Sequence, residues 1–97
     1  MVKHIVMWEL NAEAKKDINN IASDLQKRFK SLLGVVDGLK AIEVSKNYNG
    51  GKFDIVLFCD FDTKDAQDKY QTHPAHLAIK EVVHELTCDR DCVDCEI

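Results

Sequence analysis

The chain has 97 residues, of which 45% are hydrophobic and 31% charged, with four glycines and one proline. This length suits one folded domain, and the composition excludes a disordered or fibrous chain. The 13 lysines and arginines against 17 aspartates and glutamates give a net charge of -4. A nucleic-acid-binding protein would show a positive footprint instead, so we expect a single soluble domain over residues 1–97 with no nucleic-acid partner.

The beginning of the chain and its cysteines bear on the cellular compartment. Residues 1–4 run directly into a strand-like segment without a basic leader or a cleavage site, so we expect a cytoplasmic protein. Apolar runs are far shorter than the roughly 20 residues of a membrane span, so no membrane association is expected. Cysteines of a cytoplasmic protein usually remain reduced thiols. The chain has four of them: Cys59, Cys88, Cys92 and Cys95.

The first part of the chain predicts a strand, a helix and a second strand. Residues 2–10 are rich in β-forming side chains and apolar at both sets of alternating positions, which is typical of a strand covered on two sides. Asn11 can cap a helix in which apolar residues recur every three or four positions, and Gly34 can end it. Residues 39–46 form the second predicted strand.

A hairpin is predicted in the middle of the chain. The turn-forming sequence Asn-Gly-Gly at 49–51 follows the strand at 39–46 and precedes a third strand over 53–61. The third strand is again apolar at both sets of alternating positions. We therefore expect the second and third strands to pair antiparallel.

The last part of the chain completes the pattern of a known fold class. Thr63 can cap a short helix that reaches Tyr70, a second helical segment begins at Pro74, and residues 92–97 form a short last strand. The order is strand, helix, strand, strand, helical region, strand. This is the ferredoxin-like α+β fold, with both helical regions on one face of a four-stranded antiparallel sheet.

Helices on one face leave the other face bare, although the first and third strands are apolar on both. By parity we assign one face to Ile5, Met7, Ile55 and Leu57, and the other to Val6, Trp8, Val56 and Phe58. An uncovered set would exceed what soluble monomers usually expose. We therefore predict a homodimer whose sheets pack face to face over roughly 1,600 Å² in total. The alternative is that loops of the same chain cover the bare face.

The cysteines near the end of the chain have the C-x3-C-x2-C spacing that holds an iron–sulfur cluster in radical SAM enzymes. We expect this match to be accidental, because alternation along a strand sends Cys92 and Cys95 to opposite faces. Cys95 is expected to be a small buried residue, with Cys88 and Cys92 nearer the surface. No iron–sulfur cluster or zinc site is expected.

Three histidines, at two places in the sequence, are candidates for chemistry. His73 and His76 lie three residues apart at a helix start, where two imidazoles could share a metal ion or a substrate. No carboxylate at a metal-site spacing completes the set, so no bound metal is expected. His4 shares a strand face with Val6 and Trp8, and a buried imidazole there needs a hydrogen-bond partner.

Asp54 is the partner that we expect for His4. Its position in the third strand has the same parity as Val56 and Phe58, which we assign to the face of His4. Two interpretations of this face stay open: it lines a small-molecule cavity, or it forms solid core.

Four segments spread over the whole chain are similar to one known family. They are Lys3–Trp8, Phe53–Phe58, Tyr70–His76 and Val93–Ile97. Together they resemble the stress-responsive dimeric A/B barrel family, often called Dabb. The resemblance implies a ferredoxin-like monomer whose sheet pairs with that of a twin subunit into a central β-barrel. This agrees with the dimer that the two-faced strands predict.

Most members of this family have no known reaction, but one plant member is a polyketide cyclase with a pocket between sheet and helices. Its pocket residues correspond to His4, Tyr70 and His76 here, whereas Asp54 replaces a histidine, so the same substrate is not expected. The resemblance implies that His76 would remove a proton α to a carbonyl while Tyr70 donates a hydrogen bond to the enolate. His4 would position one of them, Asp54 could set a histidine tautomer, and no cofactor is needed.

The leading hypothesis is a cytoplasmic homodimer that binds a small, largely apolar or polyketide-like ligand between sheet and helices. The residues expected to contact the ligand are His4, Val6, Trp8, Asp54, Val56, Phe58, Tyr70, His73 and His76. One alternative is a cofactor-free enzyme of cyclase, isomerase or monooxygenase type that uses His76 and Tyr70. The other is a purely structural, stress-related dimer with a filled core.

Overall fold

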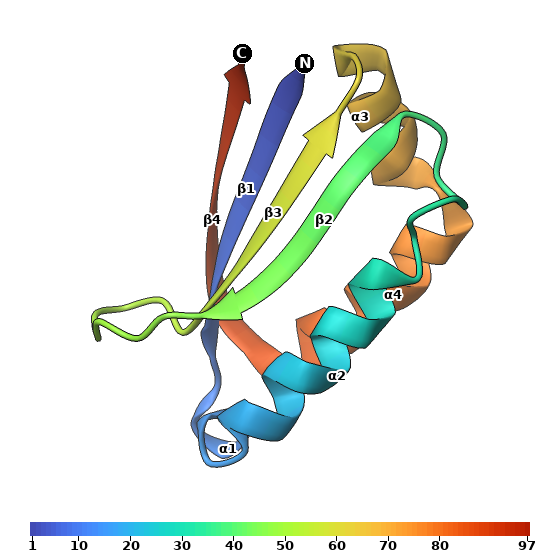
Figure 1. Ribbon diagram of the computed structural model, residues 1–97. Helices are drawn as coiled ribbons and strands as arrows, with labels where there is room; N and C mark the ends of the chain where they lie inside the picture. The colour runs from blue at the N-terminus through green and yellow to red at the C-terminus, as the bar shows by residue number, and fades with distance from the viewer.

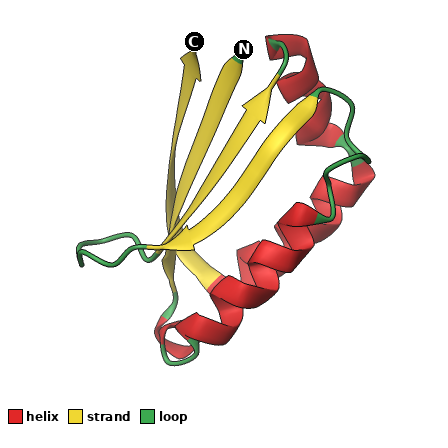
Figure 2. Cartoon of the chain, in the orientation of Figure 1, coloured by secondary structure: helices red, strands yellow, loops and turns green.

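A four-stranded antiparallel sheet carries all its helices on one side (Figures 1 and 2). The computed structural model describes residues 1–97. The elements are β1 (Val2–Leu10), α1 (Ala12–Lys15), α2 (Ile18–Lys30), β2 (Leu39–Lys46), β3 (Ile55–Phe61), α3 (Lys64–Thr72), α4 (Pro74–Leu86) and β4 (Thr87–Glu96). The strand order is β2-β3-β1-β4, which confirms the predicted ferredoxin-like α+β fold.

β1 lies in the middle of the sheet, between β3 and β4. Its residues alternate between buried and half-buried from Val2 to Leu10. In the pairing with β3, Val6 lies opposite Leu57 and Trp8 opposite Ile55. Residues directly opposite each other in an antiparallel pair point to the same face. These four side chains are buried and therefore form the floor beneath the helices.

The predicted assignment of side chains to the two faces is wrong for β3. Ile55 and Leu57 lie on the helix side, whereas Val56 and Phe58 lie on the open side, opposite Met7 and Ile5. The pairing joins even-numbered residues of β1 to odd-numbered residues of β3. No tight turn connects these two strands, so their relative register cannot be counted from the sequence.

The single helix predicted after β1 is divided into α1 and α2. The Asn11 side chain accepts a hydrogen bond from the Ala14 amide at 2.9 Å, as its position predicts. Asp17 begins α2 without a side-chain cap, and α2 ends at Lys30, before the predicted end. Successive turns follow, and Gly34 has the positive φ of 82° that these turns require.

The hairpin between β2 and β3 forms where the sequence predicts it. The Asn47 side chain donates to the backbone oxygens of Gly50 and Phe53 and thereby closes the loop. β3 begins at Ile55, and Asp54 before it fastens β3 to β1. Its backbone amide donates to Trp8, and its carboxylate accepts from the Leu10 amide, both at 2.8 Å.

The helices that follow β3 begin at the predicted caps. Thr63 accepts a hydrogen bond from the Ala66 amide at the start of α3. Pro74 lies in the first turn of α4, and the His73 ring accepts from the Ala75 amide at 3.1 Å. None of the helices is both long and apolar enough to span a membrane.

β4 is longer than predicted and includes all three cysteines of the C-x3-C-x2-C sequence. Cys92 lies opposite Val6 and Cys95 opposite Lys3, so the two thiols point to opposite faces. Cys95 is exposed and Cys92 is partly covered, which corrects the expectation that Cys95 is the buried one. Burial raises the pKa of the fourth thiol, Cys59, to about 12, so Cys59 is a neutral core residue. All four cysteines are free.

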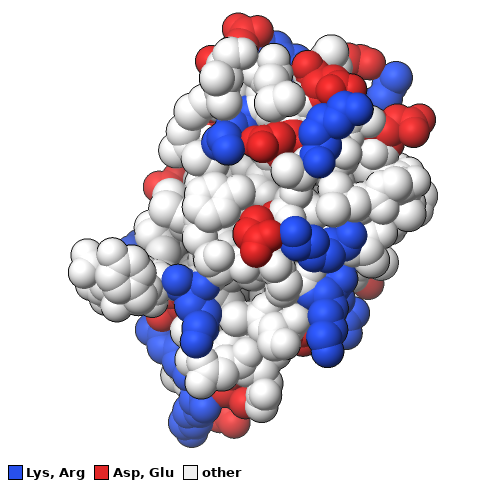
Figure 3. Space-filling view, in the orientation of Figure 1, with Lys and Arg blue, Asp and Glu red and all other residues white.

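Basic and acidic side chains are intermixed over the face seen in Figure 3, with no continuous basic field there. The white protrusion at the left of that view belongs to the loop between β2 and β3 (Figures 1 and 3). Tyr48 in this loop is 97% exposed. The surface therefore fits the mixed composition of the chain.

The side of the sheet away from the helices carries an apolar strip. It consists of Ile5, Met7, Val56, Phe58 and Val93, which neighbour one another through the strand pairing. Phe58 is 38% and Val93 49% exposed, although both are large apolar side chains. No segment of the chain covers this strip in Figure 1, so it is the surface on which a second subunit is expected to pack.

Replacing the phenylalanine of this strip with an acid tests the dimer. Phe58→Asp would bury a charge in an apolar interface, which we expect to raise the dimer dissociation constant by about 100-fold or more. Sedimentation equilibrium at micromolar protein should show a dimer for the parent chain and a monomer for the variant. Tyr48→Asp adds the same charge at the exposed loop and should remain dimeric. A monomeric parent chain would end this assignment.

Candidate functional site

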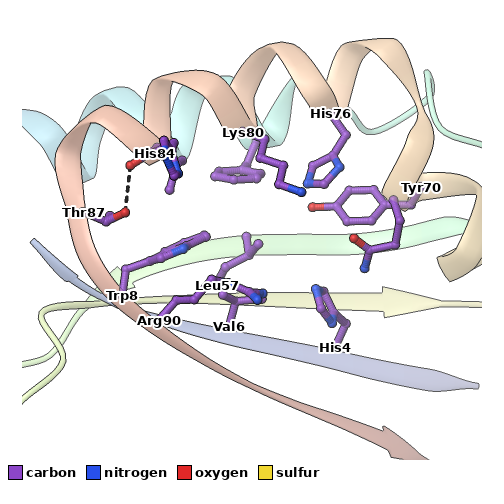
Figure 4. Close-up of a pocket in the computed structure, with 13 residues that line it drawn as sticks. His4, Val6, Trp8, Leu57, Tyr70, His76, Lys80, His84, Thr87 and Arg90 are labelled. Carbon is purple, nitrogen blue, oxygen red and sulfur yellow. Dashed lines mark hydrogen bonds between the residues drawn. The ribbon is translucent and has the colours of Figure 1, made fainter.

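A cavity of about 310 Å³ lies between the sheet and the helices (Figure 4). Strands β1, β3 and β4 form its floor, and α2, α3 and α4 contribute the side chains above the floor. Ligand sites in proteins are commonly concave, of this size or larger, and combine apolar walls with a few polar groups. The cavity therefore is the candidate site of this chain.

Most of the apolar side chains that line the cavity gather toward one end. Val6 and Leu57 lie side by side on the floor because their strands pair at these residues. Trp8 lies one step further along β1, and its ring stacks on Phe29 of α2 with centroids 5.9 Å apart. Val83 of α4 closes this end from above. The walls here can pack against a hydrocarbon or aromatic group.

The other end of the cavity is polar and is formed by two histidines and a tyrosine. The rings of Tyr70 and His76 stack with centroids 4.0 Å apart, and the His4 ring meets Tyr70 edge-on at 6.2 Å. His73 at the start of α4 points elsewhere, because its ring caps the helix. All three residues of the polar end are buried, with Tyr70 fully so.

Two buried polar atoms at this end have no partner within the protein. They are the Tyr70 hydroxyl and Nδ1 of His76. Burial, together with the neighbouring Cys59 thiol, raises the pKa of Tyr70, so its hydroxyl stays protonated and can donate. Burial also lowers the pKa of His76, so its imidazole is neutral at pH 7 and can accept a proton. The pair therefore offers one donor and one base to the cavity.

His4 is held by a network on its outer side. Its Nδ1 lies 2.5 Å from a carboxylate oxygen of Asp94, directly across the β1–β4 pairing. Gln67 of α3 donates to the same carboxylate at 2.9 Å. Burial opposes ionisation of Asp94, but the hydrogen bonds from His4 and Gln67 dominate and lower the pKa of this carboxyl. The partner of His4 is thus Asp94, and the prediction of Asp54 is wrong because Asp54 is used at the end of β1.

The same network is where a metal ion could find ligands. His4, Cys92 and Asp94 offer a nitrogen, a sulfur and an oxygen that lie within 4.8 Å of one another. Borderline divalent ions such as Zn²⁺ accept this combination. The direct hydrogen bond between His4 and Asp94, however, already satisfies two of the three groups without an ion.

The structure brings together five of the residues expected to contact a ligand: His4, Val6, Trp8, Tyr70 and His76. It does not bring the other four to the cavity. Val56 and Phe58 lie on the open face of the sheet, Asp54 binds the backbone of β1, and His73 caps α4.

Several cavity residues were not found from the sequence. Lys80 and His84 follow His76 at intervals of four along α4, and this spacing places them on one face of the helix. That row could have been recognised. Arg90 and Leu57 could not have been recognised from the sequence. They face the cavity only because of the register in which β4 and β3 pair with β1.

Comparison with known proteins gives a consistent result for the whole chain. Residues 2–97 match the sequence model of the Stress Responsive A/B Barrel Domain, Dabb. No curated protein matches the sequence.

Solved structures with the same fold include proteins of several kinds. A dimeric protein of unknown function with a ferredoxin-like fold from Bacteroides fragilis is 32% identical, with a TM-score of 0.85; the match covers 99% of this chain and 95% of that one. At3g17210 from Arabidopsis thaliana is 19% identical, with a TM-score of 0.82 and coverage of 100% and 95%. An antibiotic biosynthesis monooxygenase is 12% identical, with a TM-score of 0.74 and coverage of 100% and 98%. The latter two are similar in fold alone.

The buried imidazole of His76 should make folding stability depend on pH. Because burial lowers its pKa in the folded state, the unfolded chain binds the proton more readily. The free energy of unfolding should therefore fall as the pH drops below about 6.5, the ordinary histidine value. His76→Phe keeps an aromatic ring on Tyr70 and should remove this part of the decline.

Urea denaturation between about pH 7.5 and 5 measures this effect. Asp94 affects stability at lower pH. Because its carboxyl pKa is lowered in the folded state, the stability that Asp94 contributes is lost only below about pH 4. His84→Phe removes an exposed imidazole from the same helix and serves as the control. Equal pH slopes for the parent chain and His76→Phe would contradict the expectation.

Proposed function

The chain belongs to the Dabb family of stress-responsive A/B barrel domains, and we propose that it binds a small, largely apolar ligand in the cavity between sheet and helices. The observation that carries this proposal is the pair of unpartnered buried atoms on Tyr70 and His76. A buried polar atom without a hydrogen bond costs about 1–3 kcal/mol. A ligand with a carbonyl or hydroxyl oxygen at this position would recover part of that cost.

The shape of the cavity adds to the argument. The apolar side chains of Trp8 and Val6 lie next to each other on the floor of the cavity, whereas the unpartnered polar atoms of Tyr70 and His76 lie together at one end. A ligand with an apolar body and one polar end matches this division. A purely structural dimer with a filled core is less consistent with a cavity of about 310 Å³.

Dimerisation and location are part of the same proposal. The Bacteroides fragilis neighbour is dimeric, and we propose that this chain is a homodimer joined through the apolar strip of its open sheet face.

We also propose the cytoplasm as its location. The exposed free thiols of Cys88 and Cys95 suit a reducing compartment.

Intrinsic fluorescence gives a direct test of ligand binding. Trp8 is the only tryptophan of the chain and lies in the cavity wall. Native mass spectrometry of the purified protein should reveal a co-purified small molecule, and adding that molecule back should change the Trp8 emission. Tyr70→Phe removes one hydrogen bond and should weaken binding by about 2- to 10-fold.

The chain offers a matched control for that substitution. Tyr48 is its only other tyrosine and is fully exposed, so Tyr48→Phe should bind like the parent chain. A ligand whose affinity is equally insensitive to both substitutions would not occupy the polar end of the cavity, and the proposed site would then be wrong.

A cofactor-free enzyme is the second candidate, favoured by the donor and base that face the same space. Neutral His76 would accept a proton from a carbon α to a carbonyl, and the Tyr70 hydroxyl would donate to the oxygen that becomes an enolate. The Asp94 hydrogen bond on Nδ1 of His4 leaves Nε2 as the free nitrogen of that ring. His4 can thereby position the substrate or Tyr70.

This second candidate predicts a loss of turnover. With a substrate identified from a panel of β-keto compounds and quinones, His76→Ala should lower kcat by about 100-fold or more because general base catalysis is lost. His73→Asn removes a nearby imidazole outside the cavity but keeps a side chain that can cap α4. It should retain activity. An unchanged rate in His76→Ala would exclude His76 as the base.

A further inference from the structure

The charges around the cavity are all of one sign. They come from Lys80 and Arg90, two exposed side chains at the mouth of the cavity, whereas His4 and His76 lie buried inside it. None of the lining residues is an aspartate or a glutamate, although the chain has 17 of them and a net charge of -4. Local positive charge in an acidic protein is a feature that needs a physical reason.

The two cations at the mouth also lack carboxylate partners. Of the 13 lysines and arginines, most lie within 4.0 Å of a carboxylate oxygen: Lys3, Lys15, Lys16, Arg28, Lys30, Lys40, Lys52, Lys64 and Lys69. The remaining four are Lys27, Lys46, Lys80 and Arg90. Half of these unpaired cations therefore lie at one cavity.

Strand geometry explains why Arg90 is unpaired. It lies between Asp89 and Asp91 in β4, but alternation sends both carboxylates to the other face of the sheet. Asp89 there pairs with Lys52 at 2.5 Å. Arg90 lies opposite Trp8, and of these three neighbouring residues only Arg90 points to the cavity side (Figure 4).

Helix geometry explains why Lys80 has no carboxylate partner. The positions one turn before and after it on α4 are His76 and His84, so the row that faces the cavity contains no acid. Figure 4 shows the Lys80 side chain descending from α4 toward Tyr70 and His76, whereas Arg90 runs along the floor. The two cations thus approach the cavity from opposite sides.

We propose that the ligand of this cavity is an organic anion, with an acid group held between Lys80 and Arg90 and an apolar body packed on Trp8. This rests on the ligand-binding function proposed above and names the chemical class of the ligand. A carboxylate fits best, because the guanidinium of Arg90 can donate two parallel hydrogen bonds to it. A carbonyl elsewhere in the molecule would meet the Tyr70 hydroxyl and His76.

A pair of isosteric probes tests the charge requirement. 4-Phenylbutanoate and 4-phenylbutanamide share a phenyl body and differ in whether the end group is charged. We expect the carboxylate to bind about tenfold more tightly in titrations followed by Trp8 emission and calorimetry. Its advantage should shrink as sodium chloride is raised, because salt screens exposed charges.

Single substitutions then locate the charge effect. Lys80→Gln and Arg90→Gln should each weaken carboxylate binding by about three- to fivefold and leave amide binding unchanged. Arg90→Lys keeps the charge and should retain part of the preference, with circular dichroism confirming the fold of each variant. Lys27→Gln removes an unpaired lysine of α2 that does not line the cavity, and it should bind both probes like the parent chain.

The outcomes separate this inference from the function on which it rests. Equal binding of the two probes, with no effect of Lys80→Gln or Arg90→Gln, would overturn the anion proposal and leave ligand binding in place. Failure of both probes to bind at about 10 mM would count against the ligand-binding function itself. A carboxylate preference that Lys27→Gln reduces equally would reflect net charge alone and would also overturn the proposal.

Discussion

The register between β1 and β3 is the constraint on which the rest of the structure depends. Because Val6 lies opposite Leu57, one set of alternating side chains faces the helices and the other set faces outward. A shift of a single residue would exchange the two sets. Asp54 helps to hold this register, since it joins the start of β3 to the backbone at the end of β1. The cavity floor and the open apolar strip are thus two results of one pairing.

Local sequence signals were sufficient for most of the elements. β1 and β2 have the predicted bounds, and the caps at Asn11 and Thr63 and the proline at Pro74 mark helix starts correctly. Signals of this kind act over a few residues, so they can be recognised in the sequence. The relative register of β1 and β3, the division between α1 and α2 and the length of β4 depend on contacts between distant segments, and these were missed or wrongly assigned.

The same distinction applies to the candidate site. The positions of His4 and His76 in the sequence made them candidates, the family resemblance added Tyr70, and the three side chains do meet at one end of the cavity. Asp94 and Arg90 lie on β4. Their roles depend on the strand pairing, which places Asp94 opposite His4 and Arg90 opposite Trp8. Nothing within a few residues of either one indicates this. The four-residue spacing between His76 and Lys80, by contrast, is visible in the sequence and places both side chains on one face of a helix. That spacing would have predicted a positively charged lysine in the pocket.

The two outermost strands have a consequence for how copies of this chain can associate. β4 carries charged side chains at Asp89, Arg90, Asp91, Asp94 and Glu96, and β2 at the opposite margin carries Lys40, Glu43 and Lys46. Charged margins disfavour the addition of further strands, which is how native sheets avoid growing into fibres. Self-association is thereby directed to the sheet surface, where a two-fold arrangement closes on itself and stops at two copies.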